Sequence, residues 1–105
     1  MNIMVPSSLS EPYTKLNYND GLLYCSLLIS DGYDDWMLPT GKDLHVVLKH
    51  RGSSGLYWTR DTKMGKDKKA SSDIGMVYSH YTPHLQLEFF TTDMEFQIVP
   101  VRYDS

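Results

Sequence analysis

Three aspartates lie close together in the first half of the chain, at Asp31, Asp34 and Asp35. Carboxylate oxygens are the ligands that Ca²⁺ takes in proteins, so the cluster has the right chemistry for a cation site. Its spacing does not match an EF-hand loop, and aspartate is a routine cap and turn residue. We therefore interpret the cluster as turn chemistry, with cation binding as the alternative.

Histidine and cysteine do not form a recognisable reactive centre. His80 and His84 have the spacing of a helical zinc pair, but the proline between them breaks a helix. His45 and His50 are five apart without an evident third ligand. Cys25 is the single cysteine, which excludes an intrachain disulfide and favours a small buried thiol. Since no catalytic triad, phosphate loop or paired catalytic carboxylates stand out, we predict no enzyme activity, cofactor or metal site.

A lysine-rich segment is the strongest candidate for binding. Residues 62–70 carry four lysines and one aspartate, a formal charge of +3 in a chain of net charge −3. The segment 61–73 is too polar to pack and too long for a tight hairpin, which predicts an exposed loop. Such a loop either stays solvated or orders on an acidic partner, for instance a sulfated glycan. The predicted ligand-binding residues are Arg60, Lys63, Lys66, Lys68 and Lys69, with aromatic contacts from Tyr57, Tyr78 and Tyr81.

Length and composition limit the class of protein. The chain has 105 residues, 41% hydrophobic and 22% charged, which predicts a single domain spanning 1–105 with one compact core. A net charge of −3 disfavours general nucleic-acid binding, which needs cations to replace counterions. No apolar run approaches the roughly 18 residues of a membrane span. The N-terminus lacks the pattern of a signal peptide, so we expect the cytoplasm or a virion.

Two short helices are predicted in the first half, after an N-terminal strand and loop over residues 1–19. Asn19 or Asp20 can cap a helix over about 21–30. That helix carries an apolar stripe of Leu22, Cys25, Leu28 and Ile29. Thr40 followed by Asp43 resembles a capping box, and it predicts a second helix ending near residue 52.

The residue pattern of the second half predicts strands separated by turn-forming residues. The predicted strands cover residues 56–60, 74–81, 84–90 and 95–102. Leu85, Leu87 and Phe89 alternate with polar residues, the pattern of a half-buried antiparallel strand. The expected class is α+β, with two short helices flanking a small, mostly antiparallel sheet.

One conjunction of motifs resembles a known family. Residues 32–40 read GYDDWMLPT and are followed by Lys42-Asp43-Leu44. Tyr24-Cys25 precedes this string, YWTR follows at 57–60, and IVPVR closes the chain at 98–102. In this order the motifs resemble the Lcl-type C-terminal domain of bacterial collagen-like adhesins, over about residues 20–103.

The resemblance implies a C-type lectin-like fold, remotely similar to the formylglycine-generating enzymes, in which the chain ends come together. It also implies ligand recognition by the long loop near residues 60–73. Met37 and Val99 stand where that family has arginine. The calcium-dependent sugar motifs of C-type lectins do not occur, and Cys25 alone cannot supply the cysteine pair that formylglycine generation needs.

These observations favour a non-enzymatic recognition module that binds a glycan or protein ligand through the 60–73 loop and neighbouring tyrosines. A virion tail or decoration component is the expected setting. The alternative is an intracellular, phage-type inhibitor or adaptor that blocks a host defence or regulatory protein. A homo-oligomer formed through an exposed edge strand is a further expectation.

Overall fold

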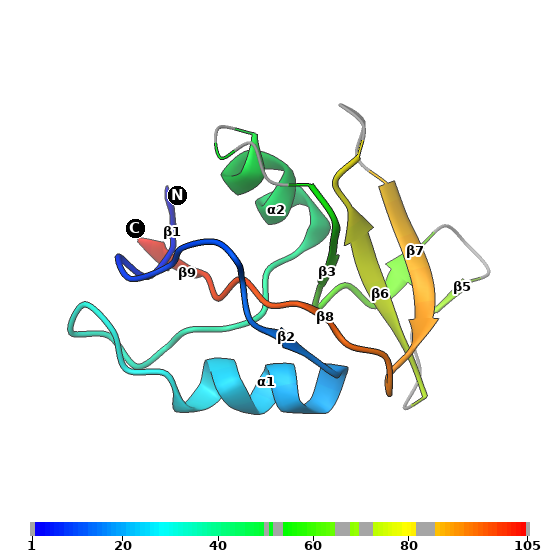
Figure 1. Cartoon of the computed structure of the whole chain (residues 1–105), viewed down its shortest axis with the longest axis horizontal. Coiled ribbons are helices and arrows are strands. Elements are labelled where there is room, and N and C mark those ends of the chain that lie inside the picture. Colours follow the sequence, from blue (N-terminus) through cyan, green and yellow to red (C-terminus); the bar gives the residue numbers. More distant parts are fainter. Residues whose placement is uncertain are drawn as a thin grey trace.

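The computed structural model describes residues 2–49, 51, 54–64, 68–69, 73–81 and 86–104. Its elements in chain order are β1 (Asn2–Met4), β2 (Lys15–Leu16), α1 (Tyr18–Leu27), α2 (Gly41–Leu48), β3 (Leu56–Trp58), β4 (Lys63–Met64), β5 (Lys68–Lys69), β6 (Ile74–Ser79), β7 (Gln86–Thr91), β8 (Phe96–Gln97) and β9 (Arg102–Asp104). Both described helices precede the longer strands, and the predicted α+β class is confirmed (Figure 1).

The main sheet of the described chain has five strands in the order β2-β8-β3-β6-β7. All its pairings are antiparallel except the parallel contact between β3 and β8. The strand predicted over 95–102 is split into β8 and β9, with Pro100 between them, where a backbone N–H donor is missing. Strand β9 pairs instead with β1, so the two ends of the chain lie together (Figure 1).

The alternation of side chains along β3 divides the core into two clusters. Tyr57 faces α2 with its cross-strand neighbour Tyr78, and both pack against Leu44 and Leu48. On the opposite face lie Trp58 and its neighbour Val77, together with Cys25 of α1. The sheet is therefore covered by α2 on one face and by α1 on the other.

Helix α1 does not present the predicted apolar stripe to the core. Its N-cap is Asn17, whose side chain accepts from the Asp20 backbone, so the helix begins and ends earlier than predicted. Gly21 and Cys25 are its buried residues, whereas Leu22 is 40% exposed and Ile29 77% exposed. The reason is close packing: a Cβ at Gly21 would lie 2.6 Å from the Cδ1 of Ile98. The helix approaches the core by Gly21 and Cys25, with Tyr18 packed at its start, whereas Leu22, Leu23 and Leu27 are exposed.

The start of α2 confirms the predicted capping box. The Asp43 backbone donates to the Thr40 hydroxyl at 3.0 Å, and the Asp43 carboxylate accepts from the Thr40 backbone at 3.0 Å. Trp36, Leu38 and Pro39, which come just before this cap, are all buried. The helix ends at Leu48, earlier than the predicted residue 52, which lies outside the described residues.

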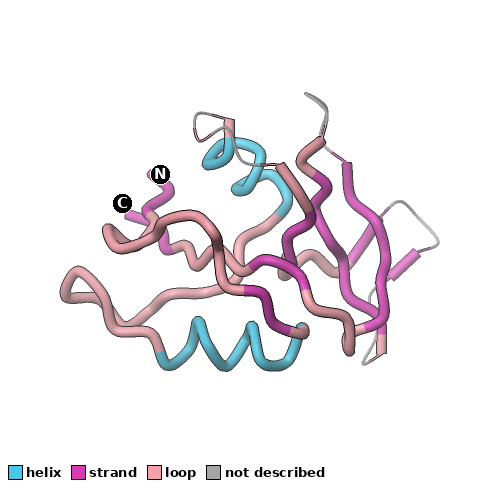
Figure 2. The backbone as a smooth tube through the Cα atoms, viewed as in Figure 1, coloured by secondary structure: helices cyan, strands magenta, loops and turns pink. Residues whose placement is uncertain are grey.

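The connection between the helices, drawn as loop in Figure 2, is held by two of the clustered aspartates. Asp31 accepts hydrogen bonds from Ser7, and these lower the pKa of its carboxyl. Asp35 accepts from Arg102 at 2.7 and 3.2 Å, and this hydrogen-bonded pair lowers the pKa of Asp35. The Arg102 guanidinium also lies 3.6 Å from the centre of the Tyr33 ring. These contacts tie the loop to both ends of the chain, which supports the turn interpretation.

A tyrosine between two histidines joins α2 to β6. The Tyr78 hydroxyl lies 3.1 Å from His45 Nδ1 and 2.9 Å from His80 Nδ1. Because one hydroxyl carries one proton, it donates to one imidazole and accepts from the other. Burial, followed by the charge of His45, lowers the pKa of His80.

We expect this arrangement to make stability sensitive to mild acid. Unfolded histidine titrates near pH 6.5, and the folded protein holds His80 neutral to a lower pH. Its contribution to stability is therefore present above about pH 6.5 and is lost as the pH falls through the folded pKa. Thermal melts between pH 7 and pH 5 should show the melting temperature falling more steeply for the wild type than for His80→Gln. Equal slopes would contradict this role.

Candidate functional site

The predicted aromatic contacts divide into buried and exposed residues. Tyr57 and Tyr78 are both 0% exposed, because β3 and β6 are interior strands of the sheet and these side chains face α2. Neither ring presents a surface to a ligand, and we withdraw both from the predicted binding set. Tyr81, just beyond the end of β6, is 66% exposed and remains a candidate.

Arg60 takes part in a network of contacts within the fold. Its guanidinium donates to the Leu38 carbonyl and to the Tyr103 hydroxyl, and it lies 3.7 Å from the Asp43 carboxylate. Tyr103 in turn donates to Asp43, whose side chain is 10% exposed. Burial and the hydrogen bond to Asp43 raise the pKa of Tyr103. Arg60 therefore has structural contacts, while its side chain stays 32% exposed and its binding role stays a prediction.

The lysine-rich segment contains two short paired strands that the sequence did not predict. Strands β4 and β5 pair antiparallel, with Lys63 opposite Lys69 and Met64 opposite Lys68. Lys66 lies outside the described residues. The binding role of these four lysines stays a prediction.

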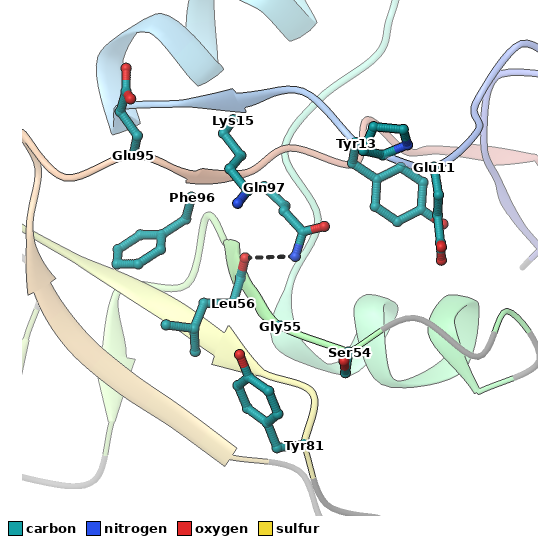
Figure 3. A pocket seen from close by; sticks show the side chains of 11 residues that line it. Glu11, Tyr13, Lys15, Ser54, Gly55, Leu56, Tyr81, Glu95, Phe96 and Gln97 are labelled. Carbon is teal, nitrogen blue, oxygen red and sulfur yellow. Dashed lines mark hydrogen bonds between the residues drawn. The ribbon is translucent and has the colours of Figure 1, made fainter.

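Tyr81 lies at the edge of an open cleft of about 800 Å³, which we call the β2–β3 cleft. The segment before β2, the start of β3 and strand β8 form its walls. Its lining residues are Glu11, Pro12, Tyr13, Lys15, Ser54, Gly55, Leu56, Tyr81, Glu95, Phe96 and Gln97. Figure 3 shows Lys15 pointing from β2 toward Gln97 and Leu56, while the Tyr81 ring rises from the opposite side.

The floor of the cleft depends on a glycine. Gly55 has φ +130°, a conformation that other residues rarely adopt, and a Cβ there would lie 2.4 Å from Gln97 Nε2. The Gln97 amide donates to the Leu56 carbonyl at 3.4 Å across the parallel contact of β3 and β8 (Figure 3). Gly55 therefore leaves room for an amide whose oxygen faces away from Leu56 and can accept a hydrogen bond.

The cleft combines an aromatic ring with both hydrogen-bond donors and hydrogen-bond acceptors. Lys15 can donate, the Ser54 hydroxyl can donate or accept, and the carboxylate of Glu11 can accept. Glu95 points away from the cleft in Figure 3. Glu11, Glu95 and Lys15 give the lining a formal charge of −1, with the Glu95 side chain turned away from the opening. This chemistry suits a ligand with many hydroxyl groups better than a strongly charged one.

Reactive chemistry is not indicated at the other candidate residues. Burial raises the pKa of the Cys25 thiol to about 12, so the thiolate nucleophile is suppressed. Among the residues that the structure describes, no three His, Cys, Asp or Glu side chains are grouped to hold a metal ion. Within the same residues, neither helix has the length and apolar character needed to cross a membrane.

Comparison of the sequence with protein-family models and with curated proteins finds no match. The candidate site therefore rests on the geometry of the cleft. Sequence reasoning found Tyr81 but missed Lys15 and Gln97, which are brought together by the pairing of β2 with β8. Gly55, just before a predicted strand, was the signal that a close backbone approach occurs there.

Proposed function

We propose that the protein is a non-enzymatic recognition module that binds a glycan in the β2–β3 cleft. The observation that carries the proposal is the position of two residues in one open cleft of about 800 Å³. The Tyr81 residue is 66% exposed at one side of the cleft, and the Lys15 side chain enters it from another side. Openings of roughly 300–1,000 Å³ are the usual size for small-ligand sites. A short oligosaccharide fits such a space.

The chemistry of a sugar ring matches the lining. A pyranose has apolar C–H faces, which a tyrosine ring can cover, and hydroxyl groups around its edge. Lys15 and Ser54 supply donors, while the Gln97 amide oxygen and the Glu11 carboxylate supply acceptors. Because the cleft is open on one side, a longer chain can extend from it into solvent.

Two sequence features support the same proposal. The GYDDWMLPT string at 32–40 resembles that of adhesin domains with a lectin-like fold, a class in which recognition is common. The lysines at 63, 66, 68 and 69 would extend the preference toward sulfated or uronic-acid glycans if they reach the bound chain. A virion tail or decoration role is the setting that we propose.

The test is retention on an array of neutral, uronic-acid and sulfated oligosaccharides, followed by calorimetry with the best-retained glycan. We expect Tyr81→Ala to weaken binding at least about tenfold, equivalent to about 1.4 kcal/mol. Tyr24→Ala is the matched control, because Tyr24 is 38% exposed and does not line the cleft. It should bind like the wild type.

Two results would contradict glycan binding in the cleft. One is an array on which no glycan is retained, and the other is equal affinity for Tyr81→Ala and the wild type. Capture of one stoichiometric protein from a cytoplasmic extract, unaffected by excess soluble polysaccharide, would instead favour the intracellular inhibitor or adaptor.

A further inference from the structure

We propose that His80 couples the β2–β3 cleft to pH, so that protonation of its ring in mild acid displaces the residues around the cleft and weakens binding there. His80 directly follows β6 and stands between the buried Tyr78 and the exposed Tyr81. The inference rests on the proposed function, because the site it regulates is the same cleft. His80 acts as a positioning residue, since its effect on a ligand passes through its neighbours.

The backbone of His80 is bonded to one residue of the cleft and is followed by another. Its N–H donates to the Gly55 carbonyl at 2.8 Å, just beyond the paired residues Leu56 and Ser79 of β3 and β6. Gly55 lines the cleft with φ +130°, and Tyr81, the next residue after His80, lines it from the opposite side. A movement of the His80 backbone therefore changes both sides of the cleft.

The ring of His80 is held by groups of β6 and α2. Its Nδ1 lies 2.9 Å from the Tyr78 hydroxyl, which also lies 3.1 Å from the Nδ1 of His45 on α2. The ring forms a further hydrogen bond with the backbone of Leu48, the last residue of α2. His80 thus connects α2, through its ring, to the cleft, through its backbone.

The surroundings of the ring favour its neutral form. Among the described residues, Tyr78 on β6 and His45 on α2 are the titratable side chains of this network, and no carboxylate is among the groups that shift the pKa of His80. Burial raises the pKa of Tyr78, so its hydroxyl keeps its proton. Burial and the charge of His45 lower the pKa of His80 and outweigh the hydrogen bond with Leu48, which raises it. An imidazolium at His80 is therefore disfavoured while the ring stays in this position.

Protonation changes the hydrogen bonds that the network can form. In the neutral network the Tyr78 hydroxyl donates to one imidazole and accepts from the other. When both rings are charged, both Nδ1 atoms are donors, and neither can accept the hydroxyl proton. The two charges also repel, because their Nδ1 atoms lie 2.9 and 3.1 Å from the same oxygen. The His80 imidazolium is stabilised by moving toward solvent, and this movement draws the His80 backbone away from Gly55.

The sign of the pH effect follows from the neutral state of the ring. Unperturbed histidine titrates near pH 6.5, and the pKa of His80 is lowered from that value. The cleft therefore keeps its geometry at neutral pH and loses it as the pH falls through the lowered pKa of His80. Because His80 takes up one proton, the affinity for a ligand falls by at most about tenfold for each pH unit.

A titration of the ¹⁵N-labelled full chain between pH 7 and pH 5, without a ligand, tests the coupling directly. We expect the amide signals of Gly55 and Tyr81 to shift with the same midpoint as the His80 ring, and these shifts to be absent in His80→Gln. His45→Gln should move the midpoint to higher pH, because it removes the charge that lowers the pKa of His80. Val46→Gln is the matched control, since Val46 follows His45 on α2 but is 57% exposed, and its midpoint should equal that of the wild type.

Circular dichroism at each pH checks that the chain stays folded, and His45→Gln carries the comparison if His80→Gln does not fold. Calorimetry with the oligosaccharide best retained on the array should show wild-type binding at least about threefold weaker at pH 5 than at pH 7, and equal binding by His80→Gln at both. Amides of Gly55 and Tyr81 that do not follow the His80 ring would overturn the proposal, and so would an equal loss of affinity in the wild type and His80→Gln. If no glycan binds, the proposed function fails while the ligand-free titration still decides whether His80 is coupled to the cleft.

Discussion

Replacing Trp58 by alanine should lower the free energy of unfolding by about 3 to 5 kcal/mol, the usual cost of deleting a buried large side chain. Trp58 is 0% exposed and contacts Tyr18 and Phe96 edge to face, at centroid distances of 5.3 and 5.2 Å. Its indole N–H donates to the carbonyls of Leu16 and Met94 at 3.1 and 3.3 Å. The substitution removes the centre of the cluster beneath α1.

Urea unfolding followed by circular dichroism measures this loss. A domain of this size is typically stable by roughly 5–15 kcal/mol, so the variant should unfold at a much lower urea concentration. Trp58→Phe is the conservative control: it keeps an aromatic ring but deletes the indole N–H, and it should cost less than the alanine variant. A loss below about 1 kcal/mol for Trp58→Ala would show that the cluster is not built around this ring.

Replacing Asp43 by alanine should cost about 2 to 4 kcal/mol, since one carboxylate serves several donors. It accepts from the Thr40 backbone in the capping box and from the Tyr103 hydroxyl, and it lies 3.7 Å from the Arg60 guanidinium. Removing it leaves the partly buried Arg60 cation without its carboxylate, and the Tyr103 hydroxyl, which still accepts from Arg60, loses its acceptor. The start of α2 and strand β9 should both loosen.

Equilibrium unfolding of three variants, Asp43→Ala, Tyr103→Phe and Asp43→Asn, separates these contributions. Tyr103→Phe keeps the ring and deletes one hydrogen bond, so its expected cost is about 1 kcal/mol. Asp43→Asn keeps a side-chain oxygen for the cap and should fall between the other two. If Asp43→Ala were no worse than Tyr103→Phe, the cap and the contact with Arg60 would contribute little.

Local chemistry made the second helix predictable. Thr40 and Asp43 form the predicted capping box, which needs only two residues three positions apart in the sequence. The class of the fold was equally predictable, since the alternation from Leu85 to Phe89 and the branched or aromatic residues of the second half predict strands. The start of the first helix was not predictable from the sequence. Asn17, Asn19 and Asp20 are all good N-cap residues, and only tertiary packing selects Asn17.

The errors have a common physical origin in long-range packing. The spacing of apolar residues along the sequence cannot show how closely α1 approaches the core. Gly21 lets the helix pack against Ile98, and Leu22 is left exposed as a result. It also cannot show which tyrosines of a strand face the core, and Tyr57 and Tyr78 both do. The candidate cleft depends on β2 lying beside β8, a pairing between residues 15–16 and 96–97 that neither segment reveals alone.

The most direct test of the proposed function is an amide NMR titration of the ¹⁵N-labelled protein with the oligosaccharide best retained on the array. Binding in the β2–β3 cleft predicts saturable shifts at Lys15, Gly55, Tyr81 and Gln97, with α1 amides unmoved. Shifts confined to surfaces outside the cleft, or no shifts at any glycan concentration, would contradict a glycan site there.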